Sequence, residues 1–555
     1  MSEINENLAN SNKQAILSIK NLSVSLPARA DRPFAVEDVS FELFPGEILC
    51  IVGESGSGKS MSSNAVMGLL PKPHVKVAAG EIIFEGRDLV SISDADMQSI
   101  RGSKIGMIFQ EPMTALNPVM KVTKQLEEVF QSHHLKLSKK EVKSKIIEML
   151  DDVGLPDPHI IGNSYPFELS GGQRQRVMIA MALALQPKVL IADEPTTALD
   201  VTTQAQILKL VADLQKTRNM GVIFITHDFG VVAEIADRVI VMKLGKIVEQ
   251  GSAEEILNRP QHPYTRKLIS TVPKLGAQKK APITSEVVVC VRNLFKTYGS
   301  AKKDMFGNVG RVVHASKDIS LEIRKGETLG LVGESGSGKS TVGRCIIRLH
   351  DSNSGVIDFQ GQDLLKLSNA EMMPIRQNIQ MIFQDPYASL NPRRKIGDII
   401  TEGPTIHGVP KAQSWKKAEQ LLEIVGLDKY ALKRYPHEFS GGQRQRIGIA
   451  RALAMSPKLL IADEAVSALD VSVQAQVLEL LDEIKIKMDL AMLFVTHDLR
   501  VAAQVCDNIA VMKLGEIVEY GATYDVFNNP QHEYTKSLLA AVPGKEWVVP
   551  DLSEF

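Results

Sequence analysis

Cysteine is scarce in this chain of 555 residues, which contains only Cys50, Cys290, Cys345 and Cys506. The four lie far apart and no C-x-x-C pair occurs, so the sequence supports neither a zinc ribbon nor a framework of short-range disulfides. Such usage is typical of proteins in a reducing compartment such as the cytosol.

Long apolar runs are also missing. No stretch of 18 or more apolar residues occurs, and the longest candidates, such as Ile48–Val52, have the length of a single strand. The segment Met1–Gln14 is polar and partly acidic without an apolar core, so we expect no signal peptide there. The sequence therefore predicts a chain that does not cross a membrane by itself.

Neither sign of charge is in excess. Lys plus Arg number 64 against 65 Asp plus Glu, which gives a net charge of −1. Proteins that act on nucleic acid usually carry a basic surplus, so the balance argues against that role. Apolar residues make up 44% and charged residues 23%, an ordinary globular mixture. At roughly 150 residues per domain, the length allows three or four structural units.

The chain does contain one long pattern that occurs twice. The motifs that follow the glycine-rich motif all recur after the same number of residues. The glycine-rich motif itself recurs after a slightly larger number, so the loop length between it and the next motif differs in the two copies. A period this long predicts two copies of a whole domain and not a solenoid. The repeated motifs are GESGSGKS (Gly53–Ser60 and Gly333–Ser340), LSGGQRQR and FSGGQRQR (Leu169–Arg176 and Phe439–Arg446), IADEPTTALD and IADEAVSALD (Ile191–Asp200 and Ile461–Asp470), and FITHD and FVTHD (Phe224–Asp228 and Phe494–Asp498).

The organisation that follows is two domains and a short linker. We expect a polar tail at 1–15, a first domain at 16–273, a linker at 274–286, a second domain at 287–543 and a tail at 544–555. In each copy short apolar runs alternate with helical stretches, which favours a parallel α/β core. The expected strands are Glu47–Val52, Val189–Ala192, Gly221–Thr226, Thr328–Val332, Leu459–Ala462 and Ala491–Thr496, and the expected helical stretches are Leu126–Met149 and Ala412–Val425.

The glycine-rich motif follows a strand and precedes a helix, as in a phosphate-binding loop. In the first copy the backbone N–H groups of Ser55–Lys59 can surround a β-phosphate at the positive end of the helix. Lys59 and Lys339 can reach the β- and γ-phosphates, and the hydroxyls of Ser60 and Ser340 can ligate Mg²⁺. Two matches, each after a strand, are far more specific than a glycine- and serine-rich turn.

Two adjacent carboxylates end a buried strand in each copy. Asp193 and Asp463 can hold Mg²⁺ through its water shell, while Glu194 and Glu464 can polarise an attacking water as general bases. Adjacent carboxylates can also simply cap a strand, but the neighbouring motifs favour the chemical interpretation.

Histidine and glutamine complete the constellation. His227 and His497 follow another strand and could contact the γ-phosphate, and Gln110 and Gln384 could reach both Mg²⁺ and the water. Each of these residues alone would more often be structural or on the surface, so its role depends on the other motifs.

The sequence Ser-Gly-Gly before a helix, at Ser170 and again at Ser440, offers hydroxyl and N–H donors for a second anion-binding turn. Together with the preceding motifs it resembles the signature of the ATP-binding cassette (ABC) ATPases, over about Ile16–Pro273 and Val287–Pro543. The resemblance implies two tandem ABC nucleotide-binding domains, each a RecA-like P-loop core with an antiparallel β subdomain and a helical subdomain. It also implies head-to-tail pairing, with ATP between the glycine-rich loop of one domain and the SGGQ of the other.

The resemblance also implies the full set of site residues, with both sites competent. The expected catalytic residues are Glu194, Glu464, His227, His497, Gln110 and Gln384. The expected Mg²⁺ site uses Ser60, Gln110 and Asp193 in one copy and Ser340, Gln384 and Asp463 in the other, with the aspartates acting through water. The expected ATP-binding residues are Gly53, Glu54, Ser55, Gly56, Ser57, Gly58, Lys59, Ser60, Met61, Tyr298, Gly333, Glu334, Ser335, Gly336, Ser337, Gly338, Lys339, Ser340, Thr341, Ser170, Gly171, Gly172, Gln173, Ser440, Gly441, Gly442 and Gln443.

One departure concerns the adenine. The family stacks the base on an aromatic residue, which Tyr298 matches, but the equivalent position in the first copy is Leu26. Adenine in the first site is therefore expected to be held more weakly, unless Phe34 substitutes.

Further motifs resemble the peptide/nickel importer family of ABC ATPases. The resemblance implies a peripheral ATPase at the cytoplasmic face of a bacterial inner membrane. It would use ATP and Mg²⁺ to drive two integral-membrane permease subunits fed by a periplasmic solute-binding protein, with no nucleic acid as partner. Small peptides are the expected cargo, glutathione first, while dipeptides, oligopeptides and nickel complexes stay open. The motifs are FQEPMTALNP (Phe109–Pro118), FQDPYASLNP (Phe383–Pro392), PQHPYTRKL (Pro260–Leu268) and PQHEYTKSL (Pro530–Leu538).

The alternative is a soluble tandem-cassette ATPase that acts on ribosomes or nucleic acid. Such proteins usually carry a long charged linker and a basic arm, whereas here the expected linker is short and the net charge is −1. UvrA-like repair ATPases need zinc cysteines, and export ATPases are commonly fused to membrane helices. The importer is favoured. Its solute, the relative activity of the two sites and the number of chains per transporter stay open.

Overall fold

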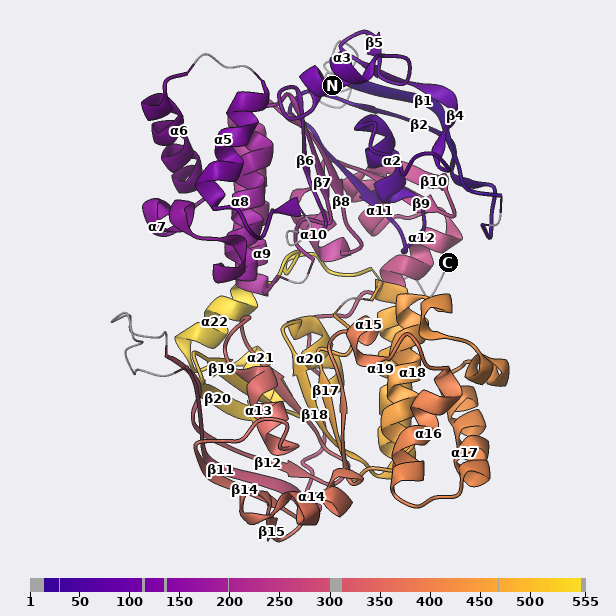
Figure 1. Ribbon diagram of the computed structural model, residues 1–555, viewed down its shortest axis with the longest axis vertical. Helices are drawn as coiled ribbons and strands as arrows, with labels where there is room; N and C mark the ends of the chain where they lie inside the picture. The colour runs from indigo at the N-terminus through magenta and orange to yellow at the C-terminus, as the bar shows by residue number, and fades with distance from the viewer. Residues whose placement is uncertain are drawn as a thin grey trace. The chain divides into compact units, whose positions relative to one another are not determined.

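The computed structural model describes residues 14–28, 30–111, 115–133, 137–197, 199–299, 312–467 and 469–550 (Figure 1). Positions 1–13 and 551–555 of the two expected tails, and 112–114 of the FQEPMTALNP motif, lie outside these ranges. The chain divides into two compact units. Unit 1 takes its described residues from 1–199, 203–272 and 543–555, and unit 2 from 200–202 and 273–542.

Unit 1 contains two sheets. A four-stranded antiparallel sheet has the order β2-β1-β4-β5, and a six-stranded sheet has the order β10-β9-β3-β8-β7-β6. In the larger sheet β9, β3, β8, β7 and β6 run parallel, and β10 is antiparallel to β9. The strands are β1 (Leu17–Ser25), β2 (Phe34–Leu43), β3 (Ile48–Val52), β4 (Lys76–Phe84), β5 (Arg87–Asp88), β6 (Ile105–Ile108), β7 (Val189–Asp193), β8 (Gly221–Ile225), β9 (Arg238–Lys243) and β10 (Lys246–Ser252).

The residue pattern explains the two kinds of sheet. Every residue of β3, β7 and β8 is buried, as expected for central parallel strands covered on both faces. Along β2 buried and exposed residues alternate, because one face of the antiparallel sheet meets solvent. The buried faces of the two sheets share one apolar core, which includes Leu22, Val36, Ile51 and Ile191.

The helices of unit 1 form a layer on the parallel sheet and a separate lobe. Helices α5, α6 and α7 pack on one another and on α8, away from the antiparallel sheet (Figure 1). The stretch Leu126–Met149, expected to be helical, is divided between α5 and α6, because Ser138 and Glu141 form a capping box that starts a new helix. The helices are α2 (Lys59–Val66), α3 (Asp94–Ile100), α5 (Val122–Ser132), α6 (Lys139–Asp152), α7 (Pro158–Asn163), α8 (Gly171–Leu183), α9 (Val201–Arg218), α10 (Phe229–Ile235), α11 (Ala253–Asn258) and α12 (Pro263–Ser270).

Unit 2 repeats this architecture, with sheet orders β12-β11-β14-β15 and β16-β17-β18-β13-β19-β20. Each unit thus combines a parallel P-loop core, an antiparallel sheet and a helical lobe, which confirms the expected fold class. The elements are β11 (Val287–Tyr298), β12 (Val313–Arg324), β13 (Thr328–Val332), β14 (Ser354–Phe359), β15 (Gln362–Asp363), β16 (Ile379–Ile382), β17 (Leu459–Asp463), β18 (Ala491–Thr496), β19 (Asn508–Lys513) and β20 (Glu516–Ala522), with α13 (Lys339–Ile346), α14 (Asn369–Arg376), α15 (Pro386–Ser389), α16 (Ile396–Ile406), α17 (Lys411–Ile424), α18 (Gly441–Leu453), α19 (Val471–Met488), α20 (Leu499–Val505), α21 (Thr523–Asn528) and α22 (Glu533–Ala540).

The last described residues, 543–550, belong to unit 1. The backbone N–H of Gly544 donates to Oε2 of Glu234 in α10 at 3.1 Å, and Nε1 of Trp547 donates to Oδ1 of Asn258 in α11 at 3.1 Å. None of the helices in the described ranges combines the length and the apolar character that crossing a bilayer requires.

Candidate nucleotide sites

The chemistry-bearing residues of each unit lie at one edge of the parallel sheet. In unit 1 the glycine-rich loop follows β3, Asp193 ends β7, and His227 stands shortly after β8. The carboxyl ends of neighbouring parallel strands meet at the same edge, where open α/β sheets bind their ligands. In unit 2, β13, β17 and β18 place the corresponding residues in the same way.

The glycine-rich loop needs its glycines. Gly53 has φ +148°, and a Cβ there would overlap the carbonyl oxygen of Met242. Gly58 has φ +104° and forms the N-cap of α2, so Lys59, Ser60 and Met61 occupy the first turn of that helix. Only glycine adopts these conformations without strain. In unit 2 the loop Gly333–Gly338 repeats both angles, and Lys339, Ser340 and Thr341 begin α13.

The loop lysines are buried and already engaged with the loop. The ammonium of Lys59 donates to the carbonyl oxygens of Gly53 at 2.7 Å and Glu54 at 3.1 Å. Lys339 makes the same two contacts in unit 2, each at 2.8 Å. Burial lowers the pKa of Lys339 from its ordinary value. An incoming phosphate would therefore meet a lysine that is oriented in advance.

A serine and an aspartate pair in each unit. Ser60 donates to Oδ1 of Asp193 at 2.9 Å, and Ser340 donates to Oδ1 of Asp463 at 2.7 Å. Burial raises the pKa of Asp193 to about 6 and also raises the pKa of Asp463. Oδ2 of Asp463 is buried and has no hydrogen-bond partner among the described residues.

Glu194 is the centre of a hydrogen-bonded cluster. Its Oε2 accepts from the amide of Gln110 and from the hydroxyl of Thr197, both at 3.1 Å, and lies 3.5 Å from Nδ1 of His227. Burial alone would raise the pKa of Glu194, but His227 and Lys59 outweigh it and hold this pKa at about 2. The sequence motifs predicted a site role for every member of this cluster except Thr197. Nothing in the sequence marks Thr197 as a site residue apart from its position shortly after Glu194.

Unit 2 has a similar cluster around Glu464, except that Ser467, at the position of Thr197, donates to the backbone carbonyl of Glu464 at 3.1 Å. The amide of Gln384 donates to Oε2 of Glu464 at 2.6 Å, and Nδ1 of His497 lies 3.4 Å from Oε1. Burial would lower the pKa of His497, but the hydrogen bond and charge of Glu464 raise it on balance. The pKa of Glu464 is correspondingly lowered, despite its burial.

The SGGQ segments begin helices. The hydroxyl of Ser170 accepts from the N–H of Gln173 at 3.2 Å, and the side chain of Gln173 accepts from the N–H of Ser170 at 3.0 Å. This reciprocal pair is a capping box for α8, and Ser440 and Gln443 form the same box for α18. The Ser-x-x-Gln spacing already carried this signal in the sequence. The box fixes the first turn, where Gly171 and Gly172, or Gly441 and Gly442, present their N–H groups.

The candidate adenine positions differ between the units. The ring of Tyr298 meets His350 edge-on, with 5.9 Å between centroids, and Nζ of Lys296 lies 4.9 Å from its centroid. In unit 1, Leu26 packs partly buried against the core, and Phe34 begins β2.

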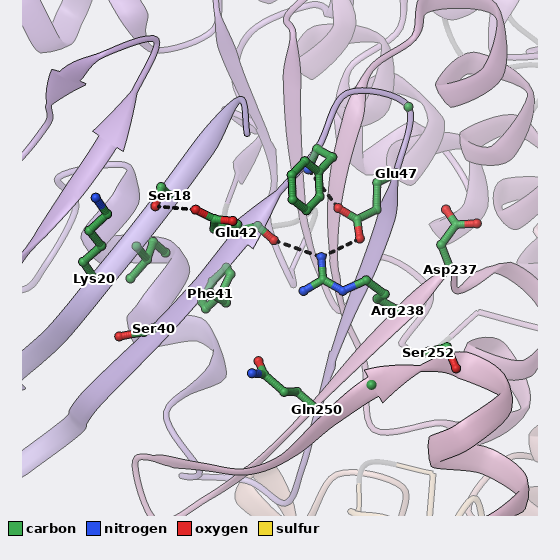
Figure 2. Close-up of a pocket in the computed structure, with 14 residues that line it drawn as sticks. Ser18, Lys20, Ser40, Phe41, Glu42, Glu47, Asp237, Arg238, Gln250 and Ser252 are labelled. Carbon is green, nitrogen blue, oxygen red and sulfur yellow. Dashed lines mark hydrogen bonds and ion pairs between the residues drawn. The ribbon is translucent and has the colours of Figure 1, made fainter. Parts of the chain in front are cut away.

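A hollow of about 960 Å³ in unit 1 is lined by none of these residues, and Figure 2 shows the side chains that do line it. Two of its charged side chains pair with each other, since Arg238 donates to Oε1 of Glu47 at 2.8 Å, and a third, Asp237, accepts from the N–H of Ile48 at 2.8 Å. Ser18 donates to Glu42 across the antiparallel sheet at 3.4 Å. The contacts of Arg238 and Asp237 hold β9 against the start of β3, and the contact of Ser18 joins β1 to β2, so these groups serve the fold.

A phosphate-binding loop, a strand-ending Asp-Glu pair, a glutamine and a histidine at one sheet edge define each unit as a P-loop nucleotide-binding ATPase. The ABC transporter family profile matches residues 36–197 and 316–467. The profile of the oligopeptide/dipeptide transporter C-terminal region matches residues 248–292 and 518–546. The chain belongs to the ABC transporter ATP-binding family, and it is an ATPase of that class.

The relatives point to one branch of the family. The chain is 49% identical to the glutathione import ATP-binding protein GsiA of Escherichia coli O6:H1 (strain CFT073), over 96% of this chain and 90% of that protein. It is also 49% identical to GsiA of Salmonella choleraesuis (strain SC-B67), over 95% of this chain and 89% of that protein. The expected membership in an ABC importer group with peptide-transporter C-terminal regions is confirmed.

Proposed function

We propose that the chain is the ATP-hydrolysing subunit of an importer for small peptides, with glutathione as the first candidate solute. The observation that carries this proposal is the identity of 49% to a glutathione import ATP-binding protein along 96% of the chain. The oligopeptide/dipeptide transporter C-terminal region, present in both units, supports a peptide importer over the alternative of a ribosome- or nucleic-acid-bound ATPase.

The residues at each sheet edge fit Mg²⁺ bound together with ATP. Mg²⁺ is usually held by one or two protein oxygens together with substrate phosphates and waters. Ser60 with Asp193, and Ser340 with Asp463, supply such oxygens, and Oδ2 of Asp463, which has no hydrogen-bond partner among the described residues, can accept from a metal-bound water. The amide nitrogen of Gln110 faces Glu194, which leaves Oε1 of Gln110 for the metal. The ion would neutralise phosphate charge during transfer.

Glu194 and Glu464 would orient and deprotonate the attacking water. A pKa of about 2 keeps Glu194 ionised, but it is low for a general base. Part of the shift comes from Lys59, whose charge a bound triphosphate would neutralise. The pKa of Glu194 would then rise, so the carboxylate would become a better base when the nucleotide is bound. His227 and His497 would donate to the γ-phosphate.

The remaining roles follow the family pattern. The SGGQ of one cassette would close the ATP site of the other, and Tyr298 would stack the adenine in unit 2. ATP binding would favour the closed pair and hydrolysis would reopen it, which couples the cycle to two permease subunits. The chain would lie peripherally at the cytoplasmic side of the inner membrane, and a periplasmic solute-binding protein would deliver the solute.

A hydrolysis-deficient variant tests this function. The double substitution Glu194→Gln, Glu464→Gln should bind ATP without splitting it and should retain permease subunits when it is purified with ATP from solubilised membranes. The matched control Glu81→Gln, Glu479→Gln makes the same charge change at two exposed positions and should turn over normally.

Mass spectrometry of the captured proteins and uptake of labelled glutathione decide the outcome. Two polytopic permeases, together with glutathione uptake that the double variant abolishes, support the proposal. Capture of ribosomal proteins or nucleic acid would overturn the importer. Capture of permeases with unaffected glutathione uptake would overturn glutathione as the solute.

A further inference from the structure

The PQHPYT motif of unit 1 (Pro260–Thr265) fixes the start of α12. Glu249 of β10 accepts from the backbone N–H groups of Gln261 at 2.6 Å and His262 at 3.2 Å. Nδ1 of His262 in turn accepts from the N–H of Tyr264 at 3.1 Å and so caps the helix. The motif therefore holds Tyr264 in one position.

The buried hydroxyl of Tyr264 reaches the glycine-rich loop, which lies far earlier in the chain. It accepts from the backbone N–H of Glu54 at 3.3 Å and donates to Oε2 of the same residue at 3.0 Å. The ammonium of Lys243 lies 4.6 Å from the ring centroid, a cation–π contact that also holds the ring.

The N–H of Glu54 and the carbonyl of Gly53 belong to one planar peptide group. The hydroxyl of Tyr264 binds the N–H side of this group, and the ammonium of Lys59 binds the carbonyl side at 2.7 Å. At φ +148° Gly53 has no side chain to limit rotation. These two hydrogen bonds fix the orientation of the peptide group, and its carbonyl helps to hold Lys59, which also donates to the carbonyl of Glu54 at 3.1 Å.

Unit 2 builds the same arrangement from a different sequence, PQHEYT. Burial raises the pKa of Tyr534, so its hydroxyl stays protonated and can both donate and accept. The matching contacts are Glu519 with the N–H groups of Gln531 (2.7 Å) and His532 (3.1 Å), Nδ1 of His532 with the N–H of Tyr534 (3.0 Å), the hydroxyl of Tyr534 with the N–H of Glu334 (3.2 Å), and Lys339 with the carbonyl of Gly333 (2.8 Å).

We propose that Tyr264 and Tyr534 are positioning residues for ATP: each hydroxyl fixes the peptide group that holds the loop lysine. The inference rests on the proposed role of Lys59 and Lys339 in phosphate binding. Without the hydroxyl, the part-buried N–H of Glu54 or Glu334 loses this hydrogen bond and the peptide group can rotate. The loop must then be reordered when ATP binds, which weakens affinity and leaves the rate at saturation unchanged.

The test uses the full chain with Tyr264→Phe and Tyr534→Phe, which keep the rings. Loss of the hydrogen bond from the tyrosine hydroxyl should raise the KM for ATP, and the Kd for a fluorescent ATP analogue, about three- to tenfold. We expect kcat to stay within about twofold of the parent value, because the substitutions affect ATP binding and not the rate at saturation. Tyr524→Phe, at a tyrosine that is 38% exposed on α21, is the control and should change neither. An unchanged KM, or a loss confined to kcat, overturns the proposal.

A double-mutant cycle separates positioning from simple stabilisation. In a Lys59→Ala, Lys339→Ala background the tyrosine substitutions should change the Kd less than about 1.5-fold, because the group that they position is gone. An equal loss in both backgrounds overturns the inference. If the Lys59→Ala, Lys339→Ala variant binds ATP as tightly as the parent, the proposed contact between the lysines and phosphate is wrong. This outcome differs from one in which only the role of the tyrosines is wrong.

A second pair of variants covers the case in which the phenylalanine variant folds poorly. His262→Ala, His532→Ala removes the cap that orients each tyrosine and should raise the KM for ATP in the same way. His262→Asn, His532→Asn restores a good N-cap and should return the KM to near the parent value. Equal KM values for the alanine and asparagine variants overturn the proposal.

Discussion

Arg344 lies beside Asp463 in unit 2, with Nη2 of the guanidinium 3.7 Å from Oδ2 of the carboxylate. The corresponding position of unit 1, on α2, is Asn64. The arginine lowers the pKa of Asp463 against the dominant effect of burial, which raises it. The two candidate Mg²⁺ sites therefore differ in charge by one unit close to the metal position.

This difference predicts unequal Mg²⁺ affinity. Replacing Arg344 with Asn removes a positive charge that opposes the cation, so the Mg²⁺ concentration for half-maximal ATPase should fall about two- to threefold, a small effect because Arg344 is 39% exposed. The reciprocal Asn64→Arg should raise this concentration. Arg292→Asn, which removes an exposed charge on β11, is the control. Unchanged Mg²⁺ dependence in both variants would contradict the prediction.

The raised pKa of Asp193 predicts an acid limit to activity. Below about pH 6 this carboxyl takes up a proton and loses the oxygen charge that attracts Mg²⁺. ATPase activity should fall below that pH, by about tenfold per unit in effective metal affinity. More Mg²⁺ should move the limit to lower pH, because metal and proton compete. An acid limit that ignores Mg²⁺ concentration would point to another group.

The raised pKa of Asp193 also affects the free energy of unfolding. Protonation of this carboxyl, which should lower activity, stabilises the folded protein. The folded, nucleotide-free unit binds this proton more tightly than the unfolded chain does. The contribution of Asp193 to the free energy of unfolding is therefore largest below its ordinary pKa of 3.8 and declines as the pH rises toward about 6. Urea unfolding of the parent and of Asp193→Asn between pH 4 and 7 measures this difference.

A pair of glutamines offers a matched test of buried polar groups. In unit 1 the amide of Gln175 donates to the carbonyl of Pro195 at 2.6 Å, next to Glu194. In unit 2, Nε2 of Gln445 is buried without a hydrogen-bond partner among the described residues. Gln175→Leu should lower the free energy of unfolding by about 1–3 kcal/mol, whereas Gln445→Leu should be neutral or stabilising. Calorimetry of the two variants compares them, and equal losses would refute the distinction.

The pKa of His497 should depend on the negative charge of Glu464. Its pKa is raised because the carboxylate outweighs the cost of burial, so Glu464→Gln should lower it. NMR titration of the imidazole in the two proteins measures the change. The stabilisation from this pair is complete below the ordinary pKa of histidine and disappears as the pH rises through the raised value. A pKa that does not respond to Glu464→Gln would mean that another group sets it.

Much of the fold could be predicted because local sequence determines it. The buried strand Ala491–Thr496 was expected with the bounds that it has, and β7 and β17 each extend just beyond the expected run, to include the aspartate. The contact of Tyr264 with Glu54 could not be predicted, since no local pattern links two residues so far apart. The same holds for Arg344 and Asp463, whose proximity depends on how α13 sits on β17.

Both units are parts of one polypeptide, so translation always makes them in a one-to-one ratio. In a cassette that pairs with a second copy of itself, every substitution appears in both sites. Here Arg344 lies beside Asp463, while the corresponding residue of unit 1 is Asn64. With both units in one chain, each site can vary independently of the other, and every molecule then carries the same difference between its two sites.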